Sequence, residues 1–209
     1  MTHLKPILIL FILFMNHSLN AQSDSIFETI FYAQRDAYLK DFANLSMKCE
    51  GAKEPLLAMD NASEEELYKL YRPDCLYKDE KDEFSISDFN SNYFFDHDKT
   101  EISLNETIIE LNPFHWNALK IDIEGNLKNN DQLILWGEKW IDIGDEKEQK
   151  NESDFKEVIH SMNIEKHDNK NITIYIDLGT SPTSALIELI DILRTNGVIK
   201  VIFKNDGDL

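Results

Sequence analysis

Residues 171–206 read NITIYIDLGTSPTSALIELIDILRTNGVIKVIFKND, and they carry the clearest structural signals in the chain. Isoleucines alternate with other residues over 172–177, which is the period of a half-buried strand. Apolar side chains then recur at helical spacing over 185–193, and Asn196-Gly197 is a typical helix stop. Residues 198–203 (VIKVIF) are mostly β-branched and apolar, with Lys200 as the exception. We therefore predict a strand, a helix and a strand around one core, made by Ile174, Ile176, Leu186, Leu189, Ile190, Leu193, Val201 and Phe203.

The loop between the first strand and the helix has a composition suited to a helix start. Ser181 is expected to be the N-cap and Pro182 to take the first helical position, where its missing amide costs nothing. Amides at a helix N-terminus bind anions or carboxylates, so Asp177, Gly179, Thr180 and Ser181 form a candidate binding loop. The alternative is that Asp177 caps the loop and holds the turn.

The preceding residues are predicted to complete a small α+β domain. Residues 119–125 alternate as a strand, and LILWGEKWIDIG (133–144) is predicted to be a hairpin with its turn at 137–139. Residues 153–165 are predicted to be a helix with one apolar side. Since both helices have a single apolar stripe, they should cover one face of a mixed sheet. The expected fold class is thus α+β, with a helical N-terminal segment followed by a β-hairpin/α/β/α/β domain.

The N-terminal half has weaker signals. A capping box predicts a helix over residues 25–47, and a second capping box predicts a short helix over 63–73. Residues 76–98 are poor in aliphatic side chains and are expected to be mostly loop. Short strands are expected within residues 102–111, before a boundary signal at Asn112-Pro113.

The first residues of the chain have the pattern of a secretory signal peptide, residues 1–21. Lys5 precedes an apolar run over residues 7–15, and Ala21 is the expected cleavage point. A membrane span needs roughly twenty apolar residues, more than this run offers. The protein is therefore expected to be exported to the periplasm or cell surface of a bacterium, and mature protein should begin at Gln22.

The remaining chain divides into a helical and loop-rich region, residues 22–112, and an α+β domain, residues 113–209. The net charge is −18, which argues against binding to nucleic acid or to an anionic membrane surface. It suits either solubility or a basic protein partner. With 42% apolar and 11% aromatic residues, the chain can build a folded core.

The segment LIDILRTNGVIKVIF, Leu189–Phe203, is similar to the last helix and strand of the periplasmic domain of the ExbD/TolR family. The strand at 172–177 and the glycine at Gly137 also sit where that domain has a strand and a glycine-containing turn. The resemblance covers roughly residues 119–204. In that family the domain dimerises and contacts envelope proteins or peptidoglycan as part of a proton-driven motor, and for this chain the resemblance implies a binding domain without the motor. Residues 1–21 contain no carboxylate, unlike the family's transmembrane helix, so proton coupling is not implied.

No motif for catalysis, cofactor binding or metal binding is found. The chain lacks a Gly-rich phosphate loop, a nucleophile elbow, and His-x-x-x-His or Cys-x-x-Cys spacing. Asp96-His97-Asp98 could offer metal ligands, but adjacent residues on a strand diverge, and a solvated loop is the preferred interpretation. His160 and His167 are both expected at the surface. We therefore predict no catalytic residue, no metal and no cofactor.

These observations favour a non-catalytic envelope protein whose C-terminal domain is a protein-binding or assembly module. Two other classes stay open: a small exported hydrolase, and an acidic immunity or inhibitor protein. A hydrolase should show a deep pocket that gathers His and carboxylates from distant segments. A binding module should expose an apolar or aromatic patch, and an inhibitor should show a contiguous acidic face.

Cys49 and Cys75, the only cysteines, are predicted to form a disulfide, since exported chains meet an oxidising compartment. The bond requires the two Cα atoms to lie within about 7 Å. Closing a loop of about 26 residues would stabilise the fold by roughly 3.5 kcal/mol in the chain-entropy model. Thiol titration of denatured, unreduced protein should find no reactive thiol. Two thiols per chain would show that the cysteines are reduced.

Overall fold

A computed structural model describes residues 26–44, 52–55, 66–87, 91, 94–125, 127–128, 130–142, 155–168 and 170–207. The expected signal peptide and Cys49 lie outside these residues. Cys75 is buried on a strand, and the disulfide stays a prediction. None of the helices in the described part of the chain is both long enough and apolar enough to cross a membrane.

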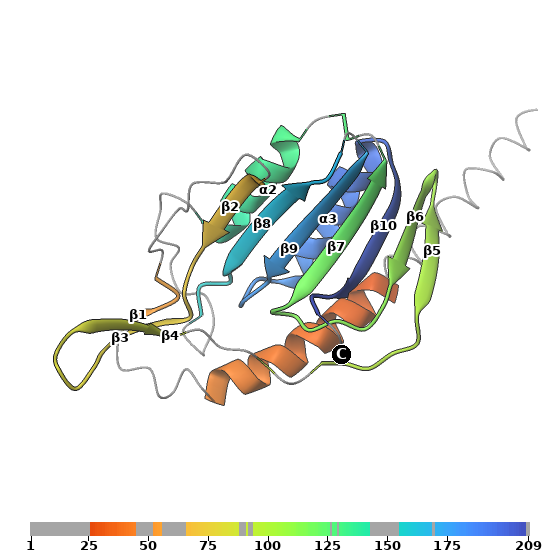
Figure 1. The fold of residues 1–209 in the computed structure, drawn as a ribbon. Coiled ribbons are helices and arrows are strands. Elements are labelled where there is room, and N and C mark those ends of the chain that lie inside the picture. Colours follow the sequence, from red (N-terminus) through yellow and green to blue (C-terminus); the bar gives the residue numbers. More distant parts are fainter. Residues whose placement is uncertain are drawn as a thin grey trace, which may run out of the picture.

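The structure confirms the predicted α+β class, and its main element is a mixed sheet of seven strands (Figure 1). Only the β10–β6 pair is parallel among the pairs described. Strands from both sides of residue 112 therefore belong to one sheet. In spatial order the strands are β2 (Glu66–Tyr71), β8 (Ser161–Lys166), β9 (Asn171–Asp177), β7 (Leu119–Gly125), β10 (Val198–Asn205), β6 (Thr107–Leu111) and β5 (Thr100–Leu104).

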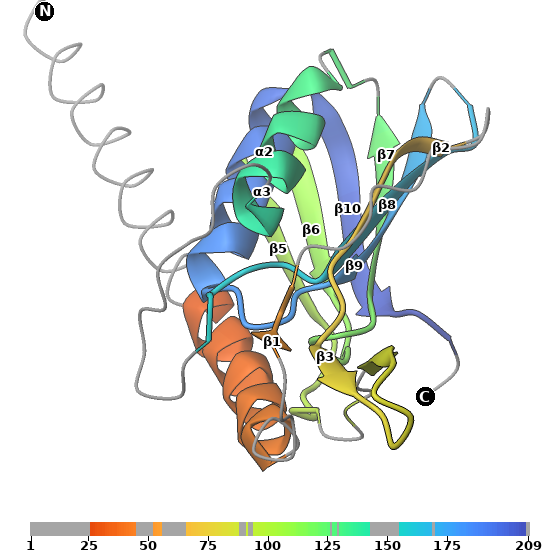
Figure 2. The same ribbon diagram turned by 90° about the vertical axis from the view of Figure 1, so that its left-hand side faces the viewer.

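The described helices lie on the same face of this sheet (Figure 2). They are the N-terminal helix (residues 26–44), α2 (Asp131–Ile141) and α3 (Thr183–Thr195). Helices cover one face of the sheet, as predicted, but of the predicted pair only α3 forms, and α2 takes the place of the helix expected at 153–165. Along the strands, the buried side chains under the helices alternate with polar side chains on the opposite face, as expected for a sheet covered on one side. On that face the Lys120 ammonium lies 5.0 Å from the centre of the Tyr175 ring.

The core fills the space between the helices and the sheet, and it includes every residue predicted for the strand–helix–strand unit. The N-terminal helix joins this core through Phe31. The Phe31 ring lies 6.0 Å from that of Phe203 on β10 and 6.4 Å from that of Phe114. The predicted N-terminal helix is therefore confirmed, and it packs against the C-terminal half of the chain.

A smaller antiparallel sheet extends from one end of the main sheet (Figure 1). It contains β1 (Ala52–Lys53), β3 (Cys75–Lys78) and β4 (Phe84–Ser87). The prediction of loop was wrong for β3 and β4, which form a hairpin. The Asp79 carboxylate holds its turn by accepting the amides of Lys81 (2.8 Å) and Glu83 (3.0 Å).

The predicted hairpin at 133–144 is wrong, because this segment forms helix α2. The glycine and the two tryptophans suggested a turn, but Leu133, Trp136 and Gly137 also recur at helical spacing. A glycine inside a helix costs only about 1 kcal/mol. That cost is offset by packing on α3, where the Trp136 indole donates to the Ala185 carbonyl at 2.9 Å.

The predicted helix at 153–165 is wrong as well. Residues 155–160 run without regular structure, and β8 follows at Ser161–Lys166. The apolar residues of this segment fit both the helical period and the strand period, because Met162 and Ile164 also alternate as in a strand and are buried. Glu157, with φ of 57°, interrupts any helix at this point.

Two further boundaries differ from the predictions. The short helix expected over 63–73 is replaced, in its described part, by β2, which pairs antiparallel with β8. Helix α3 starts one residue later than expected: Pro182 is the N-cap, and the Ser181 hydroxyl makes no hydrogen bond within the described residues. The helix stop is confirmed, since Gly197 has φ of 82°.

Glu110 on β6 should make the stability of the fold sensitive to acid. Lys99 (2.9 Å), the Asn112 amide (3.1 Å) and Lys200 (3.1 Å) bind its carboxylate and lower its pKa from 4.5 to about 2. Because the folded pKa is depressed, this contribution is present above pH 4.5 and is lost as pH falls toward 2. Urea melts should show that the stability gap between wild type and Glu110→Gln shrinks over this range. A gap that does not change with pH would contradict the assignment.

Candidate functional site

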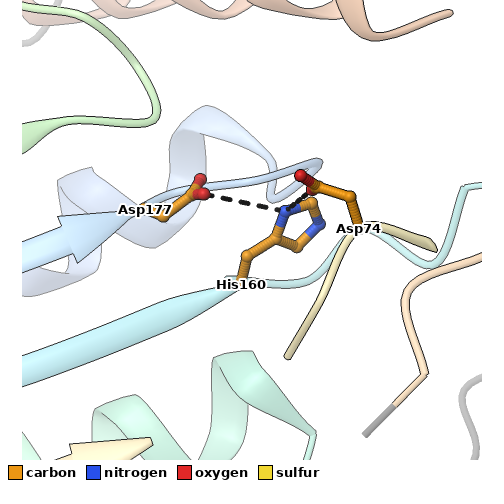
Figure 3. Close-up of side chains that lie close together, drawn as sticks. All are labelled: Asp74, His160 and Asp177. Carbon is orange, nitrogen blue, oxygen red and sulfur yellow. Dashed lines mark ion pairs between the residues drawn. The ribbon is translucent and has the colours of Figure 1, made fainter. Parts of the chain in front are cut away.

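A cluster of ionisable side chains lies at the end of the main sheet where β9 finishes. His160 immediately precedes β8, and Asp177 is the last residue of β9. Asp74 comes from the connection between β2 and β3, and His160 lies between Asp74 and Asp177 (Figure 3). Glu54 follows β1. Segments separated by more than a hundred residues therefore meet at His160.

The imidazole of His160 lies between carboxylates. Its Nε2 is 2.7 Å from Glu54 Oε1, and its Nδ1 is 2.7 Å from Asp74 Oδ1. Asp177 Oδ2 lies farther from Nδ1, at 3.9 Å. The side chains of His160, Glu54 and Asp74 are at most 3% exposed, whereas that of Asp177 is 21% exposed. The cluster is thus buried and approaches solvent at Asp177.

Glu54 is fixed by bonds from several segments. Its carboxylate accepts the Thr180 hydroxyl at 2.5 Å and the Lys156 amide at 2.7 Å. The Arg72 guanidinium donates to the Glu54 carbonyl and, at 2.7 Å, to the carbonyl of Ile141 at the end of α2. Because these bonds satisfy both Glu54 oxygens, the carboxylate and the ring that it holds have a defined orientation.

Burial and the carboxylates act in opposite directions on the charge of His160. Burial disfavours the charged ring, but Asp74 and Glu54 outweigh burial, so the pKa of His160 lies well above 6.5. Glu54 shows the complementary effect. Burial would raise its pKa, but bonds from His160, the Lys156 amide and Thr180 lower the pKa below 4.5. The carboxylates around the ring thus favour its charged form.

The candidate binding loop lies directly at this cluster. Asp177 Oδ1 accepts the Gly179 amide at 2.8 Å, which is the turn-holding role considered from the sequence. Thr180 and Ser181 are fully buried, and the Thr180 hydroxyl donates to Glu54. A carboxylate of the chain itself thus occupies the position at this loop where an anion was considered.

Gly179 allows the ring to approach the backbone of this loop. It has φ of 50°, and a Cβ at this position would lie 2.3 Å from the His160 ring. Its carbonyl accepts the Trp116 indole at 3.0 Å. A larger residue would therefore displace His160 from its carboxylates.

Sequence reasoning placed His160 at the surface, and this prediction was wrong. The error follows from the predicted helix, since a strand start directs the ring toward the end of β9 instead. The exposed position predicted for His167 is confirmed. Asp96 and Asp98 are exposed and are not part of the metal-compatible cluster found among the described residues.

A second candidate site is a groove between α2 and α3, with a volume of about 410 Å³. Leu135, Trp136 and Ile192 supply its apolar surface, and the Leu135 side chain is 61% exposed. Polar residues surround these side chains. One of them, Glu188, pairs with Lys139 at 2.7 Å and accepts the Trp140 indole at 2.9 Å.

Comparisons with protein-family models, with curated proteins and with solved structures find no match to this chain.

Proposed function

We propose that this is an exported, non-catalytic envelope protein whose helical layer binds another protein through the α2–α3 groove. The exposed Leu135 in this groove is the observation that carries the proposal. Protein interfaces typically combine an apolar centre with a polar rim, and the groove has both. Burying an exposed leucine against a partner contributes a favourable free energy of binding, because apolar surface is removed from water.

The charges around the groove suggest the chemistry of the partner. The charged side chains that line the groove are two carboxylates, Glu188 and Asp191, and one cation, Lys139. The whole chain is acidic as well, with a net charge of −18. We infer that the partner presents an apolar side chain flanked by Lys or Arg. A second copy of this chain would bring further carboxylates to the groove and would be repelled.

The buried cluster lies apart from the α2–α3 groove. A hydrolase was expected to gather His and carboxylates in a deep pocket. The chain does gather these groups, but it buries His160 and Glu54, and neither lines the α2–α3 groove. The resemblance to the ExbD/TolR domain remains part of this proposal. The last helix, glycine and strand of that domain correspond to α3, Gly197 and β10. Its glycine-containing turn has no counterpart at Gly137, which lies within helix α2.

The proposal is tested by comparing three forms of the protein as bait in an envelope extract. Leu135→Glu places a charge in the groove, and Ile86→Glu is the matched control, since Ile86 is 49% exposed on β4. Wild type and Ile86→Glu should capture the same basic protein, and Leu135→Glu should capture about tenfold less, a loss of roughly 1.4 kcal/mol. Capture should also weaken at high salt.

Equal capture by Leu135→Glu, or no capture by wild type, would contradict the groove as the binding surface. Purified protein should be monomeric by sedimentation. A dimer that Leu135→Glu dissociates would instead identify a second copy as the occupant.

A further inference from the structure

We propose that Asp74, His160 and Asp177 form a binding site for a divalent transition-metal cation such as Zn²⁺. This inference is independent of the proposed partner groove. The three residues each offer one ligand atom, and these atoms all lie within 4.8 Å of one another. They come from three separate segments and face one another (Figure 3). A metal ion could reach them from the side of Asp177, the most exposed of the three.

The position of His160 Nδ1 points to a ligand. This atom forms an ion pair with Asp74 Oδ1 at 2.7 Å, but it makes no hydrogen bond within the described part of the chain. The ring is only 2% exposed, and a buried polar atom of this kind normally has a partner. A cation between Nδ1 and the two aspartates would supply one.

The other ring nitrogen is arranged as in known metal sites. A histidine that binds a metal through one nitrogen usually donates its second N–H to a carboxylate or carbonyl. Nε2 lies 2.7 Å from Glu54 Oε1, and Thr180 and the Lys156 amide hold that carboxylate in place. This bond favours the tautomer with its proton on Nε2, which directs the lone pair of Nδ1 toward Asp74 and Asp177. On binding, the cation replaces the Nδ1 proton, which leaves to solvent.

The charge of the cluster favours a cation of charge +2. Glu54, Asp74 and Asp177 contribute three negative charges, and the Arg72 guanidinium at Glu54 contributes one positive charge. A divalent ion on the neutral ring would balance the remaining two. One imidazole with two carboxylates suits borderline ions such as Zn²⁺ better than Mg²⁺ or Ca²⁺, which prefer oxygen ligands alone.

The test uses untagged, chelator-treated protein titrated with Zn²⁺ alone by calorimetry, with thermal melting as a second readout. Asp177→Asn is the informative variant because an asparagine Oδ1 can still accept the Gly179 amide, so the turn is kept. Asp96→Asn is the matched control, since Asp96 belongs to the alternative Asp96-His97-Asp98 candidate. Urea melts without metal confirm that each variant is folded.

Wild type and Asp96→Asn should bind one Zn²⁺ per chain and melt at higher temperature with Zn²⁺. Asp177→Asn should bind Zn²⁺ at least about tenfold more weakly. A loss of this size follows even when the mutated residue only hydrogen-bonds to a metal ligand. The proposal is overturned if folded wild type takes up no Zn²⁺. It is also overturned if Asp177→Asn binds as tightly as wild type, or if Asp96→Asn loses as much affinity as Asp177→Asn.

Discussion

His160→Ala should destabilise the protein by about 3–5 kcal/mol, the usual cost of removing one partner from a buried ion pair. The ring is 2% exposed and lies between Glu54 and Asp74, so its loss leaves both carboxylates buried beside a cavity. Urea melts in the presence of a chelator would measure this cost without any contribution from a bound metal. His167→Ala is the control: His167 is exposed, and the variant loses the bond of its Nε2 to the Thr173 hydroxyl at 2.8 Å, so it should cost about 1 kcal/mol or less.

A second background separates charge from packing. In the Glu54→Gln background, residue 54 is a neutral amide, so losing His160 leaves one buried carboxylate fewer. Adding His160→Ala should therefore reduce the free energy of unfolding by less than it does in wild type. The interpretation would fail if His160→Ala cost less than about 1 kcal/mol, or if its cost were the same in both backgrounds.

Leu189→Ala should cost about 2–5 kcal/mol, the range for truncating a buried leucine. Leu189 is fully buried on α3, within the core shared by the helices and the sheet. Leu135→Ala on α2 is the matched control. It removes the same atoms from a side chain that is 61% exposed, and it should change stability by less than about 0.5 kcal/mol.

Urea melts of the two leucine variants test the assignment of both helix faces. A cost below about 0.5 kcal/mol for Leu189→Ala would mean that the predicted stripe faces solvent. A large cost for Leu135→Ala would mean that α2 buries the side chain on which the proposed groove depends.

The C-terminal strand–helix–strand unit could be predicted because its local signals agree. Alternation in β9, one apolar stripe in α3 and Asn196-Gly197 at its end all specify the same structure. Helix α2 and strand β8 could not be assigned in this way, since their apolar residues fit two periods. The bond from Trp136 to Ala185 on α3 favours the helix for this segment, and it is a tertiary contact that local sequence does not show.

The buried cluster was only partly accessible from sequence. Asp177 was recognised because it ends a strand before a glycine and a helix start. Glu54, Asp74 and His160 carry no comparable local signal, and they meet Asp177 only after β8 pairs with β9. The alternation of Met162 and Ile164 was the available indication that His160 precedes a strand.

The central claim, that the α2–α3 groove binds a protein partner, is tested most directly by photo-crosslinking in the cells that produce the protein. A photoreactive residue would replace Leu135 in one variant and Ile86, exposed on β4, in the other. We predict a crosslinked product with one basic envelope protein from position 135 and none from position 86. An adduct from position 86 with none from position 135, or a product containing two copies of this chain, would contradict the account.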